Sequence, residues 1–369
     1  MFDRRLVQNF DWGLLGLTLL LGFLGLVTLY STIIAGAGAP NPQKILYLKQ
    51  LVWYCVGLMA VLVFLLFNYK TLERLAYPIY VIGTFLLIWV LLFGKYVGGS
   101  QRWLMLGSVS IQPSELVKIA IIIVLARYYS KHASTTGFTL KELLNPLILT
   151  IIPFILIVKQ PDLGTAMLVA LIAGSMTVFS KIERRSLLCI ITFSTITVPL
   201  IWFFLKGYQK QRILTFLNPD RDPLGAGYHI IQSKIAIGSG MISGKGFLQG
   251  TQNALSFLPE QHTDFIFSIL AEEWGFVGCV VVLIIFLMVI LWGLNIAFRC
   301  RDPFGTILSF GIAVLIFWEV FINIGMTMGL LPVVGVPLPF VSYGGSSIIT
   351  IMIGIGILLN VSMRRFIPE

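Results

Sequence analysis

LPEQHTDFIFSILAEEW, residues 258–274, joins a polar, charged segment directly to a long apolar run. Its ionisable side chains are those of Glu260, His262, Asp264, Glu272 and Glu273. The two adjacent glutamates interrupt the apolar run about two helical turns after it begins. Ionisable groups at a membrane boundary are costly and are usually functional, so the sequence predicts that the chemistry lies at this junction.

The rest of the chain has the composition of a polytopic membrane protein. Of its 369 residues, 57% are hydrophobic and only 11% are charged, and the mean hydropathy is +0.92. A soluble domain carries about 25% charged residues, so a soluble globular protein is excluded. The net charge of +10 does not indicate a nucleic-acid partner, because Lys and Arg occur in ones and twos between apolar segments. The four cysteines show no paired spacing, which argues against a zinc site or a disulfide framework.

About ten apolar runs approach the roughly 20 residues that a helix needs to cross a ~30 Å hydrocarbon core. The predicted helices are Trp12–Ile34, Tyr47–Phe67, Ala76–Phe93, Pro113–Tyr129, Leu144–Val158, Leu163–Phe179, Leu187–Leu205, Phe265–Phe298, Phe304–Leu331 and Ser342–Val361. The fifth and sixth are short and joined by a tight turn, so we expect two spans, with a re-entrant hairpin as the alternative. The first run is too long for a cleaved signal peptide.

Orientation follows from the basic residues in the short loops. Alternate loops carry Arg4, Arg5, Lys70, Arg74, Arg127, Lys131, Lys141, Lys181, Arg184, Arg185, Arg299, Arg301, Arg364 and Arg365. This bias predicts that both termini are cytoplasmic and that the loop over residues 206–263 faces outward. We therefore expect an all-α integral membrane protein with about ten transmembrane helices and a large outward loop between the seventh and eighth. We expect residues 1–369 to form a single polytopic domain, with the loop not an independent domain.

Within this loop, residues 229–237 predict a short interfacial helix, because Ile231 and Ile235 are four residues apart. The glycine cluster that follows, residues 238–250, is not a phosphate-binding P-loop: its spacing differs, and Gly246 follows Lys245 where Ser or Thr is required. We interpret it as a turn near the bilayer. A nest of backbone amides for an anionic head group is the alternative, with Lys245 as the deciding residue.

Three other sets of ionisable residues are candidates. Glu115 and Lys118 are three residues apart on one helix face, which suits either helix capping or an outward-opening polar cavity. Asp162 suits the N-cap of the sixth span. His262 with Asp264 does not indicate zinc, because the other histidines lie elsewhere in the chain. Asp264 suits either a helix N-terminal carboxylate or a general base, which needs a nearby hydroxyl and exclusion of bulk water.

The outward location constrains the substrate. Nucleotide-activated sugars are absent outside the cytoplasmic membrane, so a polymerising enzyme there needs a donor carried by lipid, with a diphosphate link as the obvious type. The diphosphate needs cations within reach, and arginine can bind its oxygens bidentately. The candidates are Lys49, Arg102, Lys118, Arg212 and Lys245.

Six motifs together give the chain a specific resemblance to a known family. They are GSQRWL (99–104), QPSELVK (112–118), QPDLGT (160–165), GYHIIQSKIAIGSG (227–240), FLPEQHTDFIF (257–267) and PVVGVPLPFVSYGGSS (332–347). On these motifs nearly the whole chain resembles the SEDS family (shape, elongation, division and sporulation), and its elongation members more than its division members. The chain departs from the family at Met241 and Ile242, where relatives often have glycine.

The resemblance implies a peptidoglycan glycosyltransferase that polymerises lipid II on the outer face of the bacterial cytoplasmic membrane during elongation and rod-shape maintenance. It implies a class B penicillin-binding transpeptidase as partner, undecaprenyl diphosphate-linked glycan as substrate, and contacts with other elongation-complex membrane proteins. Asp264 matches the family's essential outer-loop aspartate and is the expected general base, and Glu115 with Lys118 matches its cavity pair. His262 and the cations would then contact substrate. A divalent cation such as Mg²⁺ would assist departure of the diphosphate lipid, although the sequence shows no ligand set for it.

Two other functions remain open. A lipid II flippase would also need about ten spans, a polar cavity and cations, but its charges should follow a path through the bilayer. Here the charges gather at the outer end, and Glu319 within the ninth span is the exception. A non-catalytic scaffold for the transpeptidase would instead tolerate the loss of Asp264, Glu115 or Lys118.

Overall fold

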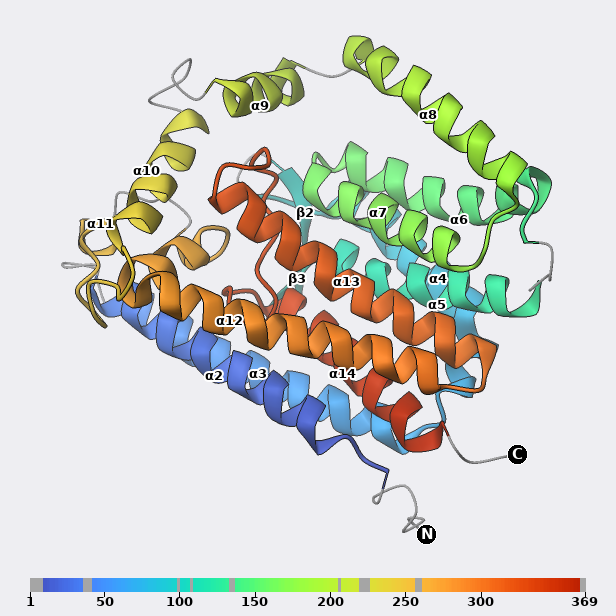
Figure 1. The fold of residues 1–369 in the computed structure, drawn as a ribbon, viewed down its shortest axis with the longest axis horizontal. Coiled ribbons are helices and arrows are strands. Elements are labelled where there is room, and N and C mark those ends of the chain that lie inside the picture. Colours follow the sequence, from blue (N-terminus) through green and yellow to red (C-terminus); the bar gives the residue numbers. More distant parts are fainter. Residues whose placement is uncertain are drawn as a thin grey trace.

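The computed structural model describes residues 9–35, 42–97, 100–106, 109–132, 137–204, 207–218, 226–255 and 261–365. Most of them lie in thirteen helices; Figure 1 shows a packed bundle, with α8 and α9 lying at its edge. Their bounds are α2 (Trp12–Ala35), α3 (Pro42–Leu66), α4 (Lys70–Phe93), α5 (Pro113–Lys131), α6 (Leu140–Lys159), α7 (Leu163–Phe179), α8 (Arg184–Phe204), α9 (Gly207–Leu217), α10 (Ala226–Ser239), α11 (Thr251–Ala254), α12 (Ile266–Arg299), α13 (Pro303–Thr327) and α14 (Gly345–Arg364).

Ten of these helices coincide with the predicted apolar runs. Seven of the described helices, α2, α3, α4, α6, α12, α13 and α14, are long and apolar enough to cross a membrane. The apolar helix α7 has 17 residues, and α5 and α8 occupy the other two predicted positions. The expected multi-pass, almost entirely helical membrane protein is therefore confirmed. The orientation of the termini stays a prediction.

A small antiparallel sheet lies between α4 and α5, where a plain loop was expected. It consists of β1 (Lys95–Val97), β2 (Ser100–Leu106) and β3 (Val109–Ile111), paired in that order. Strands this short carry little periodic signal, and the sheet forms because it packs on α4, α5 and α14. It belongs to what we call the loop end of the bundle, which comprises the described parts of residues 95–111, 240–274 and 328–344.

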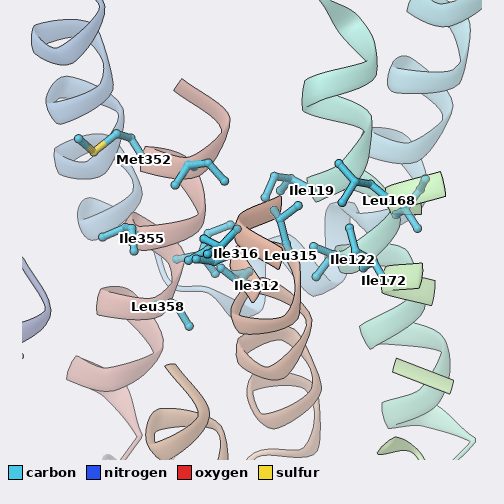
Figure 2. Packing of buried hydrophobic residues seen from close by; sticks show 14 of the residues in the cluster. Ile119, Ile122, Leu168, Ile172, Ile312, Leu315, Ile316, Met352, Ile355 and Leu358 are labelled. Carbon is cyan, nitrogen blue, oxygen red and sulfur yellow. The ribbon is translucent and has the colours of Figure 1, made fainter. Parts of the chain in front are cut away.

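Helix α13 occupies the centre of the bundle. Figure 2 shows Ile312, Leu315 and Ile316 of this helix between side chains of α14 on one side and those of α5 and α7 on the other. In their most apolar windows, α13 is 78% buried and α14 is 89% buried, against 22% for α3 and α6. Polar residues on α13 are therefore held in a close-packed environment, which makes their geometry well defined.

One correction concerns α12, which we predicted as a continuous helix directly after Asp264. The helix breaks at Gly275, whose φ of 64° and ψ of −164° are non-helical. The segment from 240 to 246 inserts at the break: the amides of Lys245 and Gly246 donate to the carbonyls of Glu272 and Glu273. The amides of Phe276 and Val277 donate to the carbonyls of Met241 and Ile242. Backbone groups freed by the break are thus paired within protein, as a membrane requires.

The break divides α12 into two parts with different tasks. An unbroken helix of 34 residues would be about 51 Å long, well beyond the ~30 Å hydrocarbon core. The part after Gly275 is about 36 Å long and is sufficient to cross the membrane. The preceding half-helix, Ile266 to Trp274, therefore belongs to the loop end, and Asp264 lies just before its first residue.

The predicted outward loop contains three helices in its described parts. The expected interfacial helix lies within α10, which packs on α12 and α13. Met241, the departure from the family pattern, has a φ of 46°, a left-handed conformation that favours glycine. That residues 206–263 form no independent domain stays a prediction.

Candidate active site

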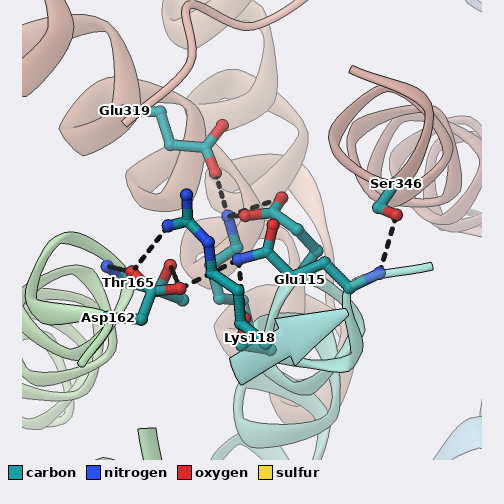
Figure 3. A network of polar contacts seen from close by, with 9 residues as sticks. Glu115, Lys118, Asp162, Thr165, Glu319 and Ser346 are labelled. Atoms are coloured by element: carbon teal, nitrogen blue, oxygen red, sulfur yellow. Dashed lines mark hydrogen bonds and ion pairs between the residues drawn. The ribbon is translucent and has the colours of Figure 1, made fainter. Parts of the chain in front are cut away.

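A fully buried lysine lies one turn into α5, close to the loop end. The Nζ atom of Lys118 is 2.9 Å from both carboxylate oxygens of Glu115 and 2.5 Å from Oε1 of Glu319 on α13 (Figure 3). Among the described residues, Oε2 of Glu319 has no hydrogen-bond partner. Because an unpaired ammonium or carboxylate is costly in an apolar interior, this triad explains how three charges are tolerated between close-packed helices.

A second polar cluster surrounds Asp162, the N-cap residue of α7. Its carboxylate accepts hydrogen bonds from Thr165 N (3.2 Å), Thr165 Oγ1 (3.0 Å) and Gln112 Nε2 (2.8 Å). Nη1 of Arg102, on β2, lies 3.8 Å from Asp162 Oδ1, and the arginine side chain is 32% exposed. Within the described structure, the Nε atom of Arg102 has no acceptor. Arg102 is thus paired with Asp162 while 32% of its side chain stays exposed.

Asp264 lies in the turn that leads into α12, and its side chain is partly exposed. Its backbone carbonyl accepts a hydrogen bond of 3.0 Å from Nδ2 of Asn323 on α13. Its carboxylate lies against the backbone at Gly335, since a Cβ atom added there would come within 3.3 Å of Oδ2. The residue is thus partly exposed, while the hydrogen bond from the central helix fixes its backbone.

The segment over residues 332–344, which we call the 332–344 loop, forms one wall around Asp264. Oγ of Ser342 donates to the carbonyl of Thr263 (2.6 Å), and the amide of Tyr343 donates to the carbonyl of His262 (2.9 Å). The rings of His262 and Tyr343 are 6.1 Å apart in a T-shaped arrangement. Burial raises the pKa of Tyr343, so its hydroxyl stays protonated near neutral pH.

The same loop connects Asp264 to the Asp162 cluster. Gly164, in the first turn of α7, packs so tightly on the loop that an added Cβ would lie 2.5 Å from the carbonyl of Val334. The backbone amide of Gln112 also donates to Oγ of Ser346 (2.9 Å), just beyond the loop. The 332–344 loop therefore packs on the Asp264 carboxylate at Gly335 and on the first turn of α7, which Asp162 caps.

Lys245 and Glu272 form a separate ion pair of 2.6 Å. The Lys245 ammonium also donates to Thr251 Oγ1 (2.7 Å), and the Glu272 side chain is 0% exposed. The neighbouring Glu273 accepts a hydrogen bond from Ser31 on α2. The nest interpretation is not supported, because the amides of residues 245 and 246 donate to backbone carbonyls.

The structure brings some of the predicted site residues together and separates others. Glu115, Lys118 and Arg102 gather where α5, α7 and β2 meet, and Asp264 and His262 lie across the 332–344 loop from them. Lys49 is exposed on α3, and Lys245 is occupied by Glu272. The side chain of Arg212 and all of Glu260 lie outside the described residues.

Reasoning from the sequence missed Asn323 and left Glu319 unexplained. The two residues are four positions apart on α13, so they share one helix face. One contacts the Lys118 triad and the other contacts Asp264. A polar pair at this spacing in an otherwise apolar helix was the signal that could have identified them.

The described parts of the chain contain no group of three or more His, Cys, Asp or Glu side chains that could hold a metal ion. A divalent cation such as Mg²⁺ at the site stays a prediction.

Comparison with known proteins gives consistent matches over nearly the whole chain. The FtsW/RodA/SpoVE family model, described as a cell cycle protein, matches residues 11–366. The chain is 45% identical to the peptidoglycan glycosyltransferase MrdB of Escherichia coli K12 over 311 residues, covering 84% of each protein.

Two solved structures are similar as well. One is a chain from a peptidoglycan synthase complex that coordinates polymerization and crosslinking: it is 32% identical, with a TM-score of 0.82, over 97% of this chain and 98% of that one. The other is the rod shape determining protein RodA of Thermus thermophilus, 27% identical with a TM-score of 0.71 over 97% and 98% of the two chains.

Proposed function

Because this chain belongs to the FtsW/RodA/SpoVE family, we propose that it is a peptidoglycan glycosyltransferase that polymerises lipid II into glycan strands during cell elongation. The observation that carries the proposal is the position of Asp264. Asp264 is partly exposed, its carboxylate lies against Gly335, and the loop that carries Gly335 also packs on Gly164, two residues after Asp162, the partner of Arg102. Glycosyl transfer from a lipid diphosphate needs a base and a cation, and this loop packs against the segments that carry both.

In the reaction, Asp264 accepts the proton of the attacking sugar hydroxyl. The hydroxyl oxygen forms a bond to the anomeric carbon of the donor as the bond from that carbon to the diphosphate oxygen breaks. The electron pair of the broken bond leaves with the lipid diphosphate, and Asp264 returns its proton to solvent. The substrate diphosphate supplies the driving force, so no further reactant is needed.

Arg102 is the cation that we assign to the diphosphate. Its guanidinium is paired with Asp162, its side chain is 32% exposed, and a planar guanidinium can bind two phosphate oxygens. Lys118 is fully buried between two carboxylates, so we assign it to holding α5 and α13 together. Lys245 is committed to Glu272, so we assign it to holding the loop at the break in α12.

The proposed surroundings follow from the same arrangement. The loop end faces outward from the bacterial cytoplasmic membrane, with both termini cytoplasmic, because the opposite loops carry most of the basic residues. A class B penicillin-binding transpeptidase is the proposed partner. The likeness to a chain of a synthase complex that joins polymerization to crosslinking supports it.

The flippase alternative loses its main support. That support was Glu319, a charge inside the membrane, which is paired with Lys118 and part of a close-packed triad. The discriminating experiment supplies lipid II to purified protein in vesicles, with and without the transpeptidase, and measures glycan strands and lipid II translocation separately. Glycan formation without translocation supports the enzyme, and translocation without glycan formation would reject it.

A further inference from the structure

Asn323 is buried in α13 and donates hydrogen bonds to both segments that border the Asp264 carboxylate. Its Nδ2 atom lies 3.0 Å from the carbonyl oxygen of Asp264 and 2.7 Å from that of Val336. One carbonyl belongs to the proposed base itself, and the other belongs to the residue directly after Gly335. A single amide group thus connects the base, the wall beside it and the central helix.

We propose that Asn323 is a positioning residue that fixes the Asp264 carboxylate against the 332–344 loop, an inference that rests on the proposed glycosyl transfer. The side chain is suited to the task because one planar NH₂ group offers two donors in fixed directions. Its orientation is determined by its partners, since the flipped amide would point an oxygen at two carbonyl oxygens. The Oδ1 atom has no partner in the described structure. The Asn323 side chain therefore acts there only through the two hydrogen bonds that its Nδ2 atom donates.

Hydrogen bonds from α3 hold the later part of the 332–344 loop, whereas the part beside Asp264 packs on Gly164 of α7 and is hydrogen-bonded by Asn323. On α3, Gln50 donates to the carbonyl of Ser342 (3.1 Å), and the hydroxyl of Tyr54 donates to that of Phe340. Hydrogen bonds from Ser342 to the carbonyl of Thr263 and from the amide of Tyr343 to the carbonyl of His262 connect this part to the segment before Asp264. Asn323 ties the earlier part, around Gly335, to the central helix. Its loss should shift the base relative to the wall while the later part of the loop stays in place.

The chain offers a matched control at the opposite end of the bundle. Asn360 of α14 is 2% exposed and also donates from Nδ2 to two backbone carbonyls, those of Phe64 and Phe67. Replacing either asparagine by alanine leaves two carbonyls unpaired, and Asn360→Ala also removes the hydrogen bond that its Oδ1 accepts from Arg364. The loss of stability should therefore be at least as large for Asn360→Ala, while only Asn323 contacts the site.

The test uses the full-length chain with its transpeptidase and measures the rate of lipid II polymerisation against lipid II concentration, together with the thermal unfolding temperature. We expect Asn323→Ala to lower kcat about tenfold or more with KM changed less than about threefold, because misplacing a catalytic group by about 1 Å has such effects. Asn323→Ser, which keeps one donor, should lie between wild type and alanine and serves if the alanine variant does not fold. Asn360→Ala should lower the unfolding temperature at least as much yet keep its kcat.

Two results would overturn the inference: a kcat for the Asn323 variants equal to that of Asn360→Ala, or a change confined to KM. Asp264→Asn separates this inference from the function on which it rests. If the wild type polymerises lipid II and Asp264→Asn does not, the proposed glycosyltransferase function is supported. The Asn323 variants then test only whether Asn323 positions Asp264. A wild type without polymerase activity would reject both.

Discussion

The ammonium group of Lys118 lies 2.5 Å from Oε1 of Glu319, 201 positions later in the sequence. Together with Glu115 it forms a triad in which one cation faces two carboxylates. The triad joins α5 to the central helix, which also carries Asn323, the partner of the Asp264 carbonyl. It therefore helps to hold the helices that support the site.

Lys118→Met should destabilise the protein by roughly 3–5 kcal/mol, because it leaves two buried carboxylates without a cation. Adding Glu319→Gln to Lys118→Met removes one of these charges and should recover part of the loss. Thermal unfolding of the detergent-purified variants measures both effects. Lys49→Met, at an exposed position on α3, is the matched control and should change little. A Lys118→Met variant as stable as this control would refute the structural role of the triad.

Arg102→Ala should reduce kcat/KM for lipid II by about 10²-fold, since it removes the cation assigned to the leaving diphosphate. Arg102→Lys should recover only part of the activity, because an ammonium group is a point charge without the bidentate geometry of guanidinium. Initial-rate kinetics of glycan formation provide the measurement. Wild-type rates in the alanine variant would show that another group stabilises the diphosphate.

The Lys245–Glu272 pair should behave as a structural contact. Lys245→Gln leaves the fully buried Glu272 without its cation and should lower stability by about 1–3 kcal/mol. In a double-mutant cycle with Glu272→Gln, the second substitution should cost less than it does alone. If Lys245 instead bound the substrate, Lys245→Gln would raise KM for lipid II and leave the unfolding temperature unchanged.

Gly275→Ala should destabilise the break in α12 by more than about 1 kcal/mol. The residue has a φ of 64°, and an added Cβ would lie 2.2 Å from the amide nitrogen of Gly244. Gly174→Ala is the control, because it lies in α7, where an added Cβ meets no atom within 4 Å. That substitution should be neutral or stabilising by up to about 1 kcal/mol. Equal unfolding temperatures for the two variants would contradict the observed break.

The sequence predicted the helices well because the length of an apolar run is a local property. It did not predict the sheet at residues 95–111, whose strands have three to seven residues and form through tertiary packing. It also missed the break at Gly275, since glycine is common in transmembrane helices. The break depends on a segment about 30 positions earlier, which inserts its backbone there.

The candidate site was predictable where single residues stand out chemically. Asp264, Glu115, Lys118 and Arg102 are ionisable groups beside apolar runs, so their types and positions drew attention to them. Their partners were not predictable, because the pairing of Lys118 with Glu319 depends on how α5 and α13 are rotated against each other. The same holds for Asn323, whose two acceptors belong to segments 59 and 13 positions away.

The most direct test of the account is the polymerisation of lipid II by Asp264→Asn in complex with the transpeptidase. The substitution keeps the size and shape of the side chain but removes its ability to accept a proton. We expect glycan formation to fall at least about 10²-fold, as the loss of a general base does, while unfolding temperature and complex formation match the wild type. Full polymerisation by this variant would contradict the assignment of Asp264 as the base.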